Sequence, residues 1–222
     1  MKRTPLFKKQ PFLADALRDV LRVCFALLPA IFVAGCVGVG KPPVQIARHL
    51  ISYPPPVFEK LPPRKETIRM ERFSIAAAYN TQEMIFRGEN AQIDSFHYNR
   101  WAANPADMVG DVLLRDMQQS GFFRAVFSRY AIGEGHCVLH GGIQEFFLRM
   151  GKTGRSAVIS LEITLIDARE RDTSKRVLMQ KNYHEEVSLE DPSPEGYCRA
   201  MSQAVETVSR RIAGDVHQRL KR

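Results

Sequence analysis

The alternation of apolar and polar residues predicts three long strands in the second half of the chain. They are Cys137–Met150, Ser156–Ala168 and Val177–Leu189. In the middle strand, every second residue from Ile159 to Leu165 is aliphatic and the residues between them are polar, which is typical of a strand with one buried face. Because the segment Gly151–Arg155 is short, we expect the first two strands to form a hairpin.

Helical periodicity predicts two amphipathic helices. Asn104 is a suitable N-cap and Pro105 suits the first turn, and Gly121 is a natural C-cap. The apolar stripe of this first helix is Met108, Val109, Val112, Leu113 and Met117. The second helix is expected to begin at Ser193-Pro194-Glu195. Its stripe is Tyr197, Met201, Ala204, Val205, Val208, Ile212 and Val216.

Shorter apolar or β-branched segments complete the predicted elements. They are Val44–Tyr53, Ile68–Ala76, Met84–Phe86 and Arg124–Ser128. The order β-β-β-α-β-β-β-β-α favours an α+β fold, an antiparallel sheet covered on one face by two helices. Prolines cluster between residues 41 and 66, which indicates a tether, an edge strand and a rigid connection. We therefore expect residues 44–222 to form a single domain.

The first forty residues have the pattern of an export signal. A basic segment leads into the apolar run Val23–Gly35, which ends at Cys36, and this order is that of a secretory signal peptide. The run is short for a membrane span, which needs about 20 residues. Uncharged residues continue to Gly40, so an uncleaved anchor is the alternative, although Pro29 and the glycines weaken such a helix. The sequence predicts a signal peptide over residues 1–35.

The end of this run adds a more specific signal. Val33-Ala34-Gly35-Cys36 resembles the lipobox of bacterial lipoproteins. The resemblance implies that Cys36 receives a diacylglycerol, that cleavage precedes it, and that residues 36–43 form a lipidated tether. In enterobacteria-like lipoproteins an aspartate after this cysteine retains the protein at the inner membrane. Val37 therefore implies an outer-membrane lipoprotein facing the periplasm. The alternative is a chance cysteine after a signal or anchor.

The charge balance is less informative than it first looks. The chain has 32 basic and 24 acidic residues, a formal charge of +8, which suggests nucleic acid or an anionic membrane as a partner. Residues 1–35 contain six basic and two acidic residues, so half of this excess would leave with the signal peptide. With 45% hydrophobic and 25% charged residues, the composition excludes a wholly disordered chain. We expect no nucleic-acid partner.

Motifs that suggest catalysis do not meet the requirements of the chemistry. Gly151-Lys152-Thr153 resembles the end of a phosphate-binding loop, but the earlier glycine is missing and the segment lies between strands. His136, Cys137 and His140 might suggest zinc, but on a strand the two histidines would share a face and Cys137 would point the other way, which does not suit one metal ion. The adjacent Glu185 and Glu186 face opposite sides for the same reason, so they form no acid–base pair. We predict no enzyme, no metal and no cofactor.

Two cysteines would remain in the exported domain. Cys24 would leave with the signal and Cys36 would be lipidated, which leaves Cys137 and Cys198. An oxidising compartment permits a disulfide between them. Their positions in the sequence do not show whether the two Cα atoms come within range, so two separate thiols are the alternative.

Several short motifs between residues 79 and 169 point to one family. They are Tyr79, Met84-Ile85-Phe86-Arg87, Tyr98-Asn99-Arg100-Trp101-Ala102, Pro105, Met108, Ser120-Gly121-Phe122-Phe123 and Leu165-Ile166-Asp167-Ala168-Arg169. Tyr53-Pro54 adds an earlier match. This pattern resembles the PqiC-like, ABC-type transport auxiliary lipoproteins, which work beside MCE-domain transporters.

The resemblance implies a function without catalysis. The chain would be a lipid-anchored auxiliary subunit of an ABC/MCE-type lipid transport system that links the inner and outer membranes and supports membrane integrity. Its partners would be an MCE-domain protein, with a permease and an ATPase in the inner membrane, and further copies of the chain are an open alternative. A second hypothesis is an outer-membrane assembly or pilot lipoprotein for a β-barrel or secretin.

The expected partner surface is the segment Tyr98, Arg100 and Trp101. An aromatic side chain beside an arginine is a common pairing at the centre of protein interfaces. The alternative is structural: Trp101 would pack the loop before the first helix onto the sheet, with Arg100 stacked or paired nearby.

Overall fold

A computed structural model describes Arg18 and residues 44–90, 92–132, 135–152 and 154–220. The chain forms two units, Met1–Val44 and Gln45–Arg222. The predicted signal peptide, Cys36 and the tether therefore lie outside the described residues, apart from Arg18. Of the helices in the described part, none is both long and apolar enough to cross a membrane.

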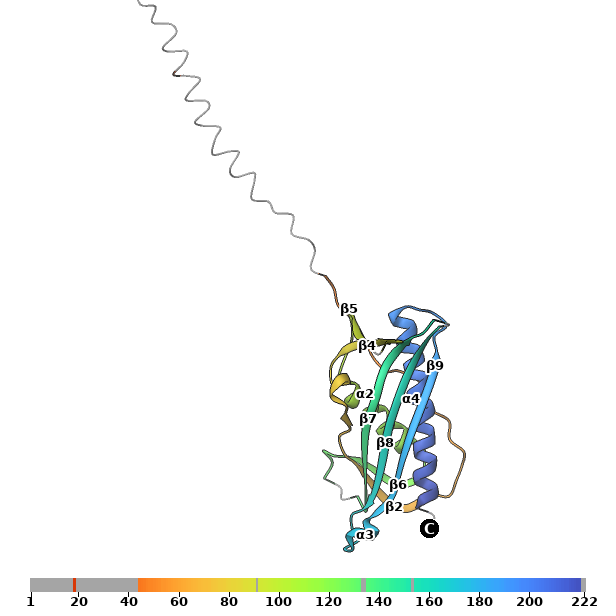
Figure 1. Ribbon diagram of the computed structural model, residues 1–222. Coiled ribbons are helices and arrows are strands. Elements are labelled where there is room, and N and C mark those ends of the chain that lie inside the picture. The colour runs from red at the N-terminus through yellow and green to blue at the C-terminus, as the bar shows by residue number, and fades with distance from the viewer. Residues whose placement is uncertain (1–17, 19–43, 91, 133–134, 153, 221–222) are drawn as a thin grey trace, which may run out of the picture. The chain divides into compact units, whose positions relative to one another are not determined.

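The unit Gln45–Arg222 is an α+β domain with one sheet, which confirms the predicted class (Figure 1). The strands among the described residues are β1 (Ala47–His49), β2 (Arg64–Met70), β3 (Ser74–Ile75), β4 (Glu83–Gly88), β5 (Ile93–Trp101), β6 (Phe123–Ser128), β7 (Cys137–Met150), β8 (Arg155–Asp167) and β9 (Val177–Ser188). The helices are η1 (Ala77–Tyr79), α2 (Pro105–Gln119), α3 (Thr173–Arg176) and α4 (Pro194–Arg219).

The prediction of an antiparallel sheet was wrong, because the sheet is mixed. The hairpin of β7 with β8 and the pair β8–β9 are antiparallel, as the alternating pattern predicts. However, β2, β3 and β4 all pair with β7 in parallel, and so do β1 with β5 and β2 with β6. Parallel neighbours are joined by long crossovers. The polarity pattern within a strand does not indicate whether its neighbour runs parallel or antiparallel to it.

The first half of the domain departs most from the predicted strands. β5 was not predicted, because its exposed and half-buried positions do not alternate regularly and its pairing with β4 is interrupted by a register shift. The predicted strand Val44–Tyr53 is reduced to β1, and Ile51 and Tyr53 are buried in extended chain beyond it. The predicted strand Ile68–Ala76 is divided between β2 and β3.

The two predicted helices cover one face of the sheet. Val109 and Leu113 of α2, Ile159 and Leu161 of β8, and four residues of α4 surround one small internal space, so both helices lie against β8. Figure 1 shows β7, β8 and β9 side by side with α4 along them. The predicted stripes are buried, except that Val112 is half-buried.

The predicted caps are confirmed at both helices. The Asn104 side chain accepts a hydrogen bond from the Ala106 amide at 3.0 Å, and Ser193 accepts one from the Gly196 amide at 3.0 Å. Gly121 follows α2 with a φ of 69°, a conformation that favours glycine. These local signals give α2 and α4 defined ends.

Candidate partner surface around β5

Trp101 is a core residue rather than a surface one. It ends β5 with an exposed fraction of 0%. Its indole ring meets Phe146 of β7 and Tyr197 of α4 edge to face, with ring centroids 5.5 Å and 5.4 Å apart. Trp101 thus joins β5 to the centre of the sheet and to the start of α4, which is the structural interpretation of this residue.

Tyr98 and Arg100 lie on the other side of β5. Because side chains alternate along a strand, these two residues share a face that Trp101 does not. Tyr98 is 58% exposed. A guanidinium nitrogen of Arg100 lies 3.7 Å from a Glu83 carboxylate oxygen on β4, and both side chains are more than a third exposed. Arg100 is therefore held in place while its outer part stays accessible.

The short edge strand β1 extends this exposed face. Arg48 is in register with Arg100 in the parallel pair, and the exposed Ile46 lies directly before the strand. We call Ile46, Arg48, Tyr98 and Arg100 the β1–β5 patch. It combines an aromatic ring, an aliphatic side chain and two guanidinium groups, a composition that suits a protein interface.

The motif residues Tyr79 of η1 and Arg87 of β4 both contact the ring of Phe147 on β7. The Tyr79 ring stacks on Phe147 at 6.0 Å, and the Arg87 guanidinium lies 3.9 Å from the centre of the same ring. Arg87 also donates to Glu145 at 3.4 Å. Burial raises the pKa of Tyr79. The parallel pairing of β4 with β7 brings these residues together, and their role is to fasten η1 and β4 to the sheet.

The sequence analysis missed a buried carboxylate at the junction of three segments. Asp116 of α2 has an exposed fraction of 0%. It accepts hydrogen bonds from the Tyr53 hydroxyl at 2.8 Å and from the Ser209 hydroxyl of α4 at 2.6 Å. Arg115 donates two more, at 2.9 and 2.8 Å. Burial, followed by the bond to Asp116, raises the pKa of Tyr53. An available signal was the position of Asp116 between Leu113 and Met117, on the inward face of α2.

The two cysteines of the domain are free thiols. Cys137 opens β7 opposite Asp167, whereas Cys198 follows the end of β9, where Ser188 is opposite Ser156. The start of β7 and the end of β9 lie at opposite ends of β8, which has thirteen residues and is therefore about 40 Å long. Cys137 and Cys198 are therefore two separate thiols in the structure and form no disulfide with each other. Burial raises the pKa of Cys137 to about 11.

The other motifs examined for catalysis take structural positions. The Gly151 amide donates to the Gly154 carbonyl at 2.9 Å, so this segment is a hairpin turn; Thr153 lies outside the described residues. Glu185 pairs with Arg211 of α4 and Glu186 with Arg149 of β7, which confirms their opposite orientations.

Potential metal ligands are dispersed in the described part of the chain. Groups of three or more histidine, cysteine, aspartate or glutamate residues that could hold a metal ion do not occur among the described residues.

Comparison with protein families identifies the chain's relatives. The model of the ABC-type transport auxiliary lipoprotein component matches residues 50–213, which is most of the chain. The chain belongs to this family. Family members are described as auxiliary lipoproteins of ABC-type transport, as the resemblance in the motifs implied. No curated protein shows a significant match.

Solved structures share the fold of this family member. Protein XCC0632 from Xanthomonas campestris has 19% identity and a TM-score of 0.64, covering 75% of this chain and 95% of its own. The hypothetical protein CT253 from Chlamydia trachomatis has 12% identity and a TM-score of 0.53, covering 70% of this chain and 98% of its own. These likenesses establish the fold.

Proposed function

We propose that this protein is a non-catalytic, lipid-anchored subunit of an ABC/MCE-type lipid transport system, attached to the outer membrane and facing the periplasm. The observation that carries the proposal is the family match over residues 50–213. In this arrangement an ATPase and a permease in the inner membrane supply the energy, an MCE-domain protein crosses the periplasm, and this chain docks that conduit. Attachment is through Cys36, whose lipobox context supports lipidation.

The β1–β5 patch is the proposed docking surface on this chain. It is exposed, it contains a tyrosine and two arginines, and these residue types are enriched at interface centres. Trp101, which the sequence analysis grouped with Tyr98 and Arg100, supports the patch from the core without reaching its surface. Tyr98 and Arg100 can therefore be replaced without disturbing the core.

Co-purification from the native host tests this function. Tagged full-length protein should bring down an MCE-domain protein, and the double variant Tyr98→Ala/Arg100→Ala should recover less than about a tenth as much, because two central contacts are lost. The melting temperature should change little, since both side chains are solvent-accessible. Arg210→Ala, an exposed arginine on α4, is the matched control and should behave like the wild type. Cys36→Ser should abolish acylation and cleavage, so that the protein accumulates as an unprocessed precursor.

Three results would contradict the proposal. Recovery of a β-barrel or secretin in place of transporter components would favour the assembly or pilot role. An unmodified Cys36 in the mature wild-type protein would remove the lipid anchor. Turnover of a lipid or peptide by the purified protein alone would show that the chain is an enzyme.

A further inference from the structure

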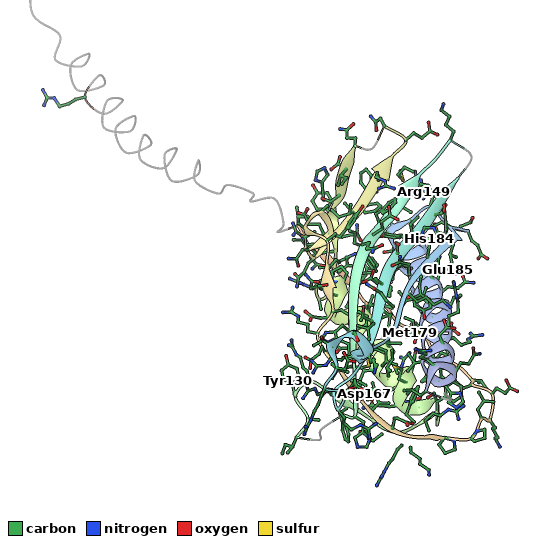
Figure 2. All side chains as sticks on the ribbon, turned by 60° about the horizontal axis from the view of Figure 1, so that its bottom comes forward. Tyr130, Arg149, Asp167, Met179, His184 and Glu185 are labelled. Carbon is green, nitrogen blue, oxygen red and sulfur yellow. The ribbon has the colours of Figure 1, made fainter. Side chains whose placement is uncertain are left out.

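A groove separate from the β1–β5 patch lies between α2 and the ends of β2 and β6. Its volume is about 450 Å³, within the range of binding sites. Residues of α2 form one side: Ala106, Asp107, Gly110, Asp111 and Leu114. The opposite side consists of the segments Met70–Phe73 and Ser128–Tyr130. Figure 2 shows Tyr130 toward the same end of the domain as Asp167, with Arg149 toward the other end.

The two walls of the groove carry opposite charges. Arg72 donates to both carboxylate oxygens of Asp107 at 2.8 Å, so Asp107 already has a cationic partner. One turn further along α2, Asp111 has no ion pair among the described residues, and partial burial and the charge of Asp107 raise its pKa. Across the groove, the Glu71 carboxylate is paired with Arg69 at 3.1 Å, and the Arg129 guanidinium lies 4.3 Å from the centre of the Tyr130 ring. A carboxylate therefore stands on one wall and a guanidinium on the other.

Apolar side chains also line the groove, and the α2 side has room for an incoming side chain. Tyr130 is 78% exposed, and Leu114 is partly buried at the groove. A Cβ atom built on Gly110 meets nothing within 4 Å, so the helix backbone is accessible there. Gly214 of α4 is equally open and lies outside the groove residues, which makes it a matched position for control experiments.

We propose that this groove binds an extended segment of a partner protein, in which a lysine or arginine meets Asp111 and a neighbouring apolar side chain packs on Leu114 and Tyr130. Backbone carbonyls or an acidic side chain of the segment would accept hydrogen bonds from Arg129. A cation beside Asp111 relieves the repulsion from Asp107. The identity of the partner as a transporter component rests on the proposed function, whereas the chemistry of the groove does not.

The same features argue against a lipid or a nucleic acid. A phospholipid needs an apolar cavity for its acyl chains, and the groove is open and carries charge on both walls. The small apolar space between α2, α4 and β8 is about 10 Å³, far too small for an acyl chain. A nucleic acid would place phosphates against Asp111, and like charges in contact oppose binding. A polypeptide segment supplies cationic, apolar and hydrogen-bonding groups together.

Site-specific photocrosslinking in the native host tests the groove. Full-length protein with p-benzoylphenylalanine in place of Tyr130 is irradiated in cells, and the attached segment is identified by mass spectrometry. We expect one protein segment with a lysine or arginine within a few residues of the crosslinked site. Gly110→Leu fills the groove and Asp111→Lys reverses its charge, so each should lower the crosslink about tenfold or more. Gly214→Leu should leave the yield unchanged.

The other outcomes overturn the inference. They are a crosslink that persists in both groove variants, a crosslink to lipid or to a second copy of the chain, a segment without a nearby basic residue, and no crosslink at all. The proposed function fails by a different result, when a basic segment is captured in the groove but belongs to a protein outside any ABC transport system.

Discussion

At the scale of single residues, Asp116 joins segments that are far apart in the sequence. Its carboxylate is fully buried and receives hydrogen bonds from Tyr53, Ser209 and Arg115. The Arg115 guanidinium also donates to the Tyr53 carbonyl at 3.0 Å and lies 4.6 Å from the centre of its ring. Two hydroxyls and one guanidinium thus satisfy a buried charge, which would otherwise be costly.

Asp116→Ala should therefore lower the free energy of unfolding by about 3–5 kcal/mol. The change leaves the hydroxyls of Tyr53 and Ser209 without their acceptor in the interior. Asp111→Ala removes an exposed carboxylate of the same helix and should change stability by less than about 0.5 kcal/mol. Urea denaturation of the full-length variants measures both. Equal midpoints for the two variants would show that Asp116 does not hold these segments together.

At the scale of elements, α2 depends on its buried stripe. Leu113 is 1% exposed and lies between β8 and α4. The next residue, Leu114, is only partly buried because it lies toward the groove. The two neighbouring leucines therefore have different surroundings. Comparing their alanine variants distinguishes the loss of packing from the change in helix propensity, which is the same for both.

Leu113→Ala should destabilise the protein by about 2–5 kcal/mol, because the neighbouring helix and strand do not collapse fully into the cavity that it leaves. Leu114→Ala changes helix propensity by the same amount but removes less packing, so its effect should be clearly smaller. Thermal unfolding monitored by circular dichroism compares the two. A shift for Leu113→Ala no larger than that for Leu114→Ala would show that the stripe does not face the core.

At the scale of the whole molecule, β7 is the centre of the sheet. It pairs with β2, β3, β4 and β8, and many of its side chains are buried. The sheet therefore unites the N-terminal strands, of which β2, β3 and β4 pair with β7 in parallel, with the antiparallel β7–β9 meander. The strand β1, by contrast, has three residues and a single partner, β5.

Hydrogen exchange should reflect this arrangement. The amides of β7 and β8 should be the slowest in the protein and should exchange together, because opening them requires global unfolding. Those of β1 should exchange orders of magnitude faster. Mass spectrometry of the full-length protein after exchange resolves these peptides. If the N-terminal strands and the β7–β9 meander each showed their own slow core, the domain would consist of two folding units.

The sequence by itself determined the elements whose signals are local. The strands β7, β8 and β9 follow from regular alternation, and α2 and α4 follow from apolar stripes bounded by Asn104, Gly121 and Ser193. The family resemblance also follows from short motifs, and the family match confirms it. Lipidation of Cys36 stays a prediction, because it lies outside the described residues.

Tertiary structure alone decided which of these elements meet and in which direction. A strand's polarity pattern records that one face is buried, but a parallel and an antiparallel neighbour can bury that face equally well, so the mixed sheet was not predictable from it. The same holds for Trp101, whose burial depends on Phe146 and Tyr197. The groove likewise arises where α2 passes the ends of β2 and β6, since its walls come from segments that only folding brings together.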